Sequence, residues 1–118
     1  MKTSDDLRLT VTLRLLDREG QRRFGPGVAA LLEEVREKRS LRAAAGAMGM
    51  AYSKAWRIVR SAEEAFGYKL LDSTIGGRNG GGAALTEEAE ALLKAYRALR
   101  DEVGAYAQKR FEERFRDL

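Results

Sequence analysis

The chain has 118 residues and a formal net charge of +4 at pH 7, from 22 basic and 18 acidic side chains. This length corresponds to one domain that can bury its own core. Cysteine and histidine are both absent, which excludes disulfide bonds, cysteine zinc sites and the commonest general base. No apolar run approaches the ~20 residues that span a bilayer, and the N-terminus lacks the apolar segment of a signal peptide, so we expect a cytoplasmic protein without a membrane partner.

Positive charge is concentrated in the first two thirds of the chain. Residues 1–39 carry nine basic and seven acidic side chains, and residues 40–82 carry six and three. Residues 83–118 carry seven basic and eight acidic side chains. A bound polyanion is therefore expected on residues 1–82.

The chain begins with a pattern that predicts a β-hairpin. From Leu7 to Leu15 every second side chain is apolar, a period that is typical of a half-buried strand. Residues 17–20 form a turn, and residues 21–24 are the candidate return strand. Gly25-Pro26-Gly27 then separates the hairpin from a helix, because proline suits the first helical turn.

Three helices are predicted over residues 28–66. An apolar stripe with three- and four-residue spacing predicts the first at residues 28–39. Ser40 is a suitable N-cap for a second helix at residues 41–48, which is rich in alanine and ends at Gly49. The third is predicted at residues 52–66 and is closed by Gly67. A short helix, a tight turn and a following helix indicate a helix-turn-helix.

The third helix has an apolar face and a basic face. Trp56 lies at the edge of the apolar face, and we expect it to pack between helices. A helix-turn-helix presents the first residues of its second helix to base edges, and residues further along contact phosphates. We therefore interpret the outward side chains as DNA contacts rather than as an ordinary solvated face. The candidates are Tyr52, Ser53, Lys54 and Arg57 for base edges and Arg60 for a phosphate.

A glycine-rich stretch at residues 76–82 follows a short strand predicted at residues 69–74. It contains Arg78 and Asn79. The pattern of a P-loop is missing, which leaves a flexible linker or the tip of a basic hairpin. Its position after the helix-turn-helix favours a wing, whose Arg78 would reach the minor groove or a phosphate. Asn79 is included with it as a DNA contact.

A long C-terminal helix is predicted from Thr86, a suitable N-cap, to the end of the chain. About 30 residues would extend ~45 Å, whereas a small domain is only ~30 Å across. Part of its apolar stripe therefore needs a partner, and a second copy of the chain is the simplest one. The alternative is a shorter helix with a frayed tail. The candidate dimerisation residues are Leu92, Tyr96, Leu99, Val103 and Tyr106.

Catalysis is not indicated. Carboxylates occur as adjacent pairs, such as Glu63-Glu64 and Glu87-Glu88, and adjacent side chains on a helix point in different directions. No serine-based catalytic motif is present. We expect no enzyme activity, no catalytic residues, no metal site and no cofactor.

Several segments together resemble one family of regulators. They are Tyr52-Ser53-Lys54-Ala55-Trp56, Gly67 with Leu70-Leu71, the glycine run through Ala83, and Leu85-Thr86. This combination resembles the N-terminal winged-helix domain of the ModE family, molybdate-responsive transcription regulators related in this domain to LysR-type regulators. The resemblance covers most of residues 7–100 and implies DNA binding and dimerisation. The family more often has glycine where Asn79 stands.

The resemblance does not imply molybdate binding here. Full-length members of the family carry C-terminal molybdate-binding domains, and nothing after Thr86 offers the strands of such a domain. We therefore expect no molybdate bound to this chain.

Together these patterns predict a mainly α protein with a small amount of β structure. Residues 1–85 would form a winged helix-turn-helix DNA-binding domain with an N-terminal β-hairpin, and residues 86–118 a dimerisation helix packed on it. The expected function is sequence-specific binding of double-stranded DNA by a homodimer that regulates transcription. The alternatives are a winged-helix protein-interaction module without DNA binding and an oxyanion (molybdate) sensor.

Overall fold

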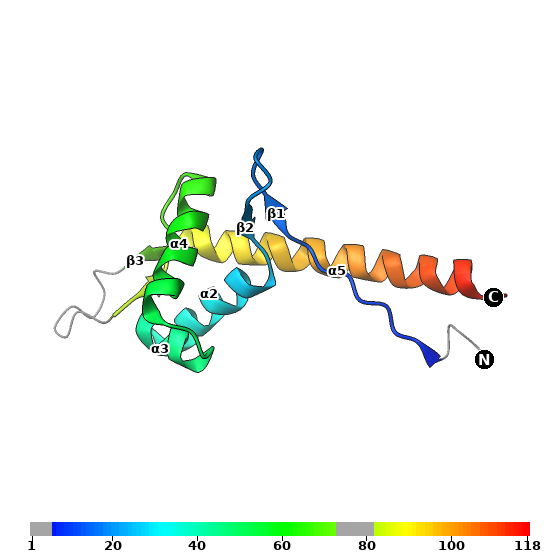
Figure 1. Cartoon of the computed structure of the whole chain (residues 1–118), viewed down its shortest axis with the longest axis horizontal. Coiled ribbons are helices and arrows are strands. Elements are labelled where there is room, and N and C mark those ends of the chain that lie inside the picture. The colour runs from blue at the N-terminus through cyan, green and yellow to red at the C-terminus, as the bar shows by residue number, and fades with distance from the viewer. Residues whose placement is uncertain (1–5, 73–81) are drawn as a thin grey trace.

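The computed structural model describes residues 6–72 and 82–118. Two small antiparallel ribbons accompany a group of helices, and one long helix extends well beyond it (Figure 1). This is the expected winged helix-turn-helix with an N-terminal hairpin and a long C-terminal helix. In chain order the elements are β1 (Leu15–Leu16), β2 (Arg22–Phe24), α2 (Pro26–Lys38), α3 (Leu41–Ala47), α4 (Tyr52–Phe66), β3 (Leu71–Asp72), β4 (Ala84–Leu85) and α5 (Glu87–Phe115).

The N-terminal hairpin is much shorter than the sequence predicts. Only Leu15 and Leu16 pair with β2, and residues 7–14 form no strand. A strand needs a partner for its backbone groups, and β2 ends at Phe24 because Pro26 already begins α2. The predicted strand over residues 7–15 is therefore wrong except at its end.

The core consists of two adjoining clusters of apolar side chains. In the first, Phe24 of the hairpin packs edge-to-face against Tyr96 of α5, with the ring centroids 5.1 Å apart. In the second, α2, α3 and α4 meet through small residues, and Ala44, Ala45 and Ala55 are at most 1% exposed. The small side chains of these alanines let α3 and α4 pack closely together.

The helix-turn-helix is formed by α3 and α4. The side chain of Ser40 caps α3 by accepting a hydrogen bond from the backbone N–H of Ala43 at 3.0 Å. α4 has the predicted bounds, and it ends where Gly67 adopts a left-handed φ of 79°, a conformation that suits glycine. Local capping signals therefore set the start of α3 and the end of α4, the candidate reading helix.

The base of the wing is attached to the helices on both sides. β3 pairs antiparallel with β4, with Leu71 opposite Leu85. The N–H of Ala83 donates to the carbonyl of Arg39 at 3.0 Å. Thr86 accepts from the N–H of Ala89 and donates its hydroxyl to the carbonyl of Lys69, so one side chain caps α5 and closes the ribbon.

α5 packs on the domain through its first third only. Ala89, Leu93 and Tyr96 are buried, and no residue of α5 after Tyr96 is buried. The hydroxyl of Tyr96 donates to the carbonyl of Leu13 at 2.8 Å, which fixes the N-terminal segment against the helix. About 28 Å of helix follows at ~1.5 Å per residue, as Figure 1 shows toward the C-terminus.

Within residues 6–72 and 82–118, no helix is long and apolar enough to cross a membrane.

Candidate nucleic-acid interface

The predicted DNA-contacting residues of α4 lie together on the exposed side of that helix. Tyr52 is 39% exposed. Ser53, Lys54, Arg57 and Arg60 are exposed as well, while the opposite side buries Ala55, Val59 and Ala62. The structure thus brings together all five of the candidate residues on α4.

Two aromatic rings on α4 are covered by arginines. The guanidinium of Arg42, on α3, lies 4.2 Å from the centroid of the Tyr52 ring. The guanidinium of Arg60 lies 4.8 Å from the Trp56 ring. Each pair places a cation over an aromatic face, an arrangement that holds a long arginine side chain in place.

The prediction that Trp56 packs between helices is wrong. Trp56 is 45% exposed. It follows Ala55 by one residue, or about 100° around the helix axis, so its side chain leaves the face on which Ala55, Val59 and Ala62 are buried. Trp56 therefore belongs to the outer surface of the helix-turn-helix.

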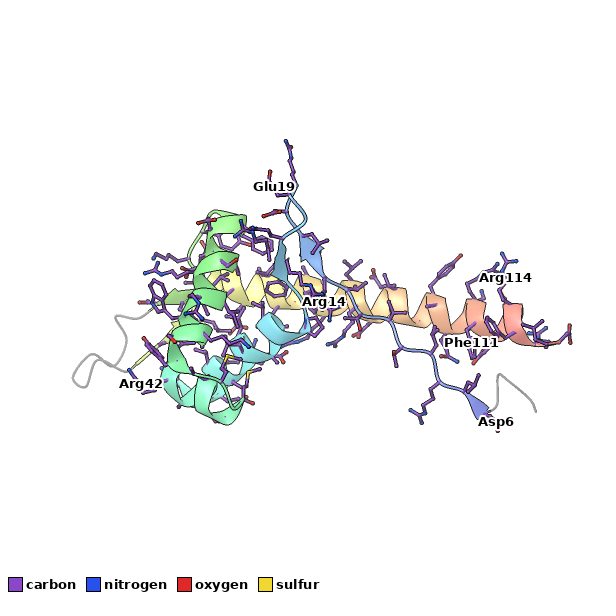
Figure 2. All side chains as sticks on the ribbon, in the orientation of Figure 1. Asp6, Arg14, Glu19, Arg42, Phe111 and Arg114 are labelled. Carbon is purple, nitrogen blue, oxygen red and sulfur yellow. The ribbon has the colours of Figure 1, made fainter. Side chains whose placement is uncertain are left out.

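Trp56 borders a depression on the wing side of α4. The depression has a volume of about 310 Å³ and extends from α3 to the base of the wing. Arg42, Arg60 and Lys69 contribute positive charge to its wall. Figure 2 shows Arg42 on the side of the molecule from which the wing emerges.

The acidic side chains of α4 are both engaged inside the molecule. Glu63 accepts hydrogen bonds from the backbone N–H of Leu70 at 2.9 Å and from Arg60 at 3.5 Å. Glu64 accepts from Arg23 of the hairpin at 3.3 Å. Lys54 and Arg57 have no such partner in the described part of the chain. The net field of the outer face of α4 is therefore positive.

Arg23 joins the hairpin to the other flank of α4. Its guanidinium donates to Asp17 at 2.9 Å and to the hydroxyl of Ser61 at 3.0 Å. Asp17 also accepts from the backbone N–H groups of Glu19 and Gln21. The Gln21 N–H, together with Arg23, lowers the pKa of Asp17, and the carboxylate raises the pKa of Arg23. The hairpin is thereby held beside the reading helix.

Two sequence-predicted contacts, Arg78 and Asn79, lie outside the described residues. Gly82, the last glycine of the run, lines the depression beside Trp56. β3 and β4 pair side by side, and Leu71 and Ala83 at their base line the same depression as Trp56 and Arg60 of α4.

Comparison with known proteins identifies the family. Residues 28–90 match the family model of the bacterial regulatory helix-turn-helix proteins of the lysR family. The chain belongs to this family. The matched region begins in α2 and ends in the first turn of α5, so it contains the helix-turn-helix and the base of the wing.

Curated relatives of the chain include two ModE proteins and a molybdenum-pterin-binding protein. The chain is 33% identical over 99 residues to the molybdenum transport protein ModE of Herbaspirillum seropedicae. The aligned region covers 84% of the chain and 35% of that protein. It is 37% identical over 71 residues to the transcriptional regulator ModE of Haemophilus influenzae, which covers 60% of the chain and 28% of that protein. The molybdenum-pterin-binding protein MopA of Rhodobacter capsulatus is 33% identical over 81 residues, 69% of the chain and 31% of that protein. The chain thus spans about a third of the length of these relatives.

The candidate dimerisation residues of this lysR-family chain occupy different environments. Tyr96 is 4% exposed and serves the core of its own chain. Leu92 and Val103 are half-buried, and Leu92 packs against that core. Leu99 and Tyr106 are 45% and 66% exposed. Of the five residues, Leu99 and Tyr106 are therefore the most accessible to a partner.

Several cations near α4 are not evident from the sequence. Arg42 and Lys69 on the wing side, and Arg14 and Arg22 on the hairpin side, line depressions that border the reading helix. They lie nine or more residues along the chain from the candidate DNA contacts of α4, and a single basic residue in a highly charged sequence carries no local signal. Within the described residues, no cluster of three or more potential ligands could hold a metal ion.

Proposed function

We propose that this chain binds double-stranded DNA sequence-specifically as a homodimer and regulates transcription. The observation that carries the proposal is the outer face of α4. It combines exposed donors with positive charge, and its two acidic side chains are already paired within the molecule. A polyanion gains from such a surface, because the protein cations replace the counterions of the phosphates.

α4 would read the major groove. An α-helix fits the ~12 Å width of this groove, and the first residues of the helix face the base edges. Ser53, Lys54 and Arg57 carry hydrogen-bond donors there. Arg57 suits a bidentate contact with guanine, because its guanidinium has no partner among the described residues. Arg60 lies one turn beyond Trp56, and it would contact a phosphate.

The wing would supply further contacts with the DNA backbone or the minor groove through Arg78 and Asn79. Support comes from the sequence of the wing and from the position of its base, since Leu71 of β3 and Ala83, just before β4, line the same depression as Trp56 and Arg60 of α4. Residues 1–85 would thus form the DNA-binding unit.

Residues 86–118 would pair two subunits. The exposed Leu99 and Tyr106 lie on the part of α5 that extends beyond the core, and Phe115 and Leu118 are exposed further along. An exposed apolar stripe on a helix that extends beyond its own core can be buried against the same stripe of a second copy. Two reading helices would then address two half-sites of the DNA.

Selection from a random pool of duplexes, followed by salt titration of the selected site, tests the proposed function. We expect log K to fall with log salt by about 0.9 for each phosphate contacted. Arg57→Ala should cost ~1–3 kcal/mol on the selected site and relax base preference at one position. Arg110→Ala is the matched control, because Arg110 lies far along α5 and is paired with Glu113. A folded protein that retards no duplex at low salt would instead support a protein-interaction module.

A further inference from the structure

We infer that the N-terminal hairpin is a second backbone clamp. The groove between the hairpin and α4 receives the phosphates that border the major groove on the side opposite the wing. The inference depends on the proposed reading of duplex DNA by α4, and it adds a contact surface that neither the helix-turn-helix nor the wing supplies.

The groove is large and lined by cations. It has a volume of about 710 Å³ and lies between the hairpin, the start of α2 and one flank of α4. None of its described lining residues is acidic. The basic lining residues are Arg14, Arg22 and Arg23 from the hairpin region and Lys54 and Arg57 from α4.

Most of these cations lack a partner in the molecule. Arg23 is paired with Asp17 and Glu64. The side chains of Arg14, Arg22, Lys54 and Arg57 form no ion pair or hydrogen bond with any described residue. Like charges that line one groove repel each other, and a bound anion lowers that repulsion. The remaining charge of the groove therefore favours a ligand with several negative charges.

The structure holds the walls of the groove in place. The guanidinium of Arg23 donates hydrogen bonds to the side-chain hydroxyl of Ser61 at 3.0 Å and to the backbone carbonyl of Ser61 at 3.3 Å. At Gly25, an added Cβ would lie 3.2 Å from the Cγ of Arg14. A glycine at this position lets the segment that bears Arg14 lie close to the start of α2. Figure 2 shows Arg14 at the base of the hairpin and Glu19 at its tip.

The position of the groove matches the geometry of bound DNA. A helix of 10–12 Å diameter fills a major groove ~12 Å wide, so the elements on its two flanks meet the two bordering backbones. Trp56 and Arg60 of α4 face the wing side, whereas Lys54, Arg57 and Ser61 face the hairpin. The base of the wing and the hairpin thus lie on opposite flanks of the same helix.

Duplex phosphate fits this groove better than a small free anion. The cations are spread along an open groove rather than directed at one point. Lys54 and Arg57 belong both to the groove and to the proposed reading face, so the positive surface is continuous from base edges to backbone. A polyanion that already lies on α4 would extend into the groove.

The test compares Arg22→Gln with Arg18→Gln on the selected duplex. Arg22 lines the groove, whereas Arg18 lies in the exposed turn of the same hairpin and does not. Glutamine keeps much of the side-chain stem and removes the charge. We expect Arg22→Gln to reduce the salt slope by about 0.9 per protomer and to weaken binding several-fold, with the ranking of base sequences unchanged. Arg18→Gln should match the wild type in both.

Phosphate-ethylation interference provides a second readout that does not depend on affinity. In Arg22→Gln and in Arg14→Gln, interference should be lost at phosphates on one side of the major groove and retained on the wing side. If the wild type binds and Arg22→Gln keeps its salt slope and full interference pattern, the clamp is wrong while the proposed function stands. If the wild type binds no duplex, the proposed function is wrong as well. Saturable calorimetric binding of inorganic phosphate that Arg22→Gln abolishes, with duplex binding unchanged, would overturn the clamp in favour of a small-anion site.

Discussion

Trp56 lies on the surface and not between helices, and Trp56→Ala tests whether it acts in DNA binding rather than in the core. Complete removal of a buried aromatic side chain costs ~3–5 kcal/mol of stability. Trp56 is 45% exposed and packs against the Arg60 guanidinium. An exposed cation–π contact contributes about 0.5–1 kcal/mol. We therefore expect the free energy of unfolding to fall by at most about 1.5 kcal/mol.

The same substitution should affect DNA binding more strongly than stability. Trp56 lies on the wing-side flank of the reading helix, and it positions Arg60, the proposed phosphate contact. Loss of both effects should weaken binding by ~1–2 kcal/mol, a factor of about 5–30. Because Trp56 is the only tryptophan of the chain, the indole emission of the wild type should also change when duplex is added.

Two assays distinguish a core role of Trp56 from a role in the DNA interface. Urea unfolding followed by circular dichroism gives the stability of the wild type, Trp56→Ala and Leu93→Ala, and fluorescence anisotropy of labelled duplex gives their affinities. Leu93 is fully buried, and its truncation should cost ~2–5 kcal/mol. A loss of stability in Trp56→Ala equal to that of Leu93→Ala would mean that Trp56 is a core residue. Unchanged affinity would remove it from the interface.

Two further predictions concern assembly and acid stability. Leu99→Glu should shift sedimentation at micromolar concentration from dimer to monomer. Ala105→Glu is the control and should leave the dimer unchanged, because Ala105 is an exposed residue of α5 about 120° away from Leu99 around the helix. A wild type that sediments as a monomer would contradict the proposed pairing. The folded structure lowers the pKa of Asp17 and of Glu90, that of Glu90 mainly through its hydrogen bond with Arg36. The two carboxylates therefore contribute fully to stability above their ordinary pKa values of 3.8 and 4.5, and this contribution is lost as the pH falls below those values. Unfolding midpoints should thus be flat from pH 6 to 9, since the chain has no histidine or cysteine, and should drop below about pH 4.5; a transition near pH 6.5 would contradict this.

Elements whose limits depend on neighbouring residues are predictable from the amino-acid sequence alone. α4 has the predicted bounds because its apolar positions repeat at helical spacing and Gly67 accepts the left-handed conformation that ends it. Ser40 and Thr86 act as the predicted N-caps, since each accepts a hydrogen bond from an N–H three residues later. Such signals depend on a few neighbouring residues, so they can be recognised in the sequence without knowledge of the tertiary structure.

The tertiary structure decided which side chains of these elements remain free. Tyr96 shares the apolar stripe of α5 with Leu99, but the position of Phe24 and Leu13 turns Tyr96 into a core residue. Residues 7–14 have the alternation of a strand, but β2 is too short to pair with them. Both outcomes depend on a partner distant in the chain, which a local period does not specify.

The hairpin groove is likewise a product of tertiary structure. Arg14 and Arg22 lie more than 30 residues from Lys54 in the sequence, and they share a groove with it because Arg23 attaches the hairpin to Ser61 of α4. The sequence determined that the reading helix is basic. Only the packing of the hairpin on that helix decided where the other cations gather, since electrostatic cooperation depends on distance in space and not along the chain.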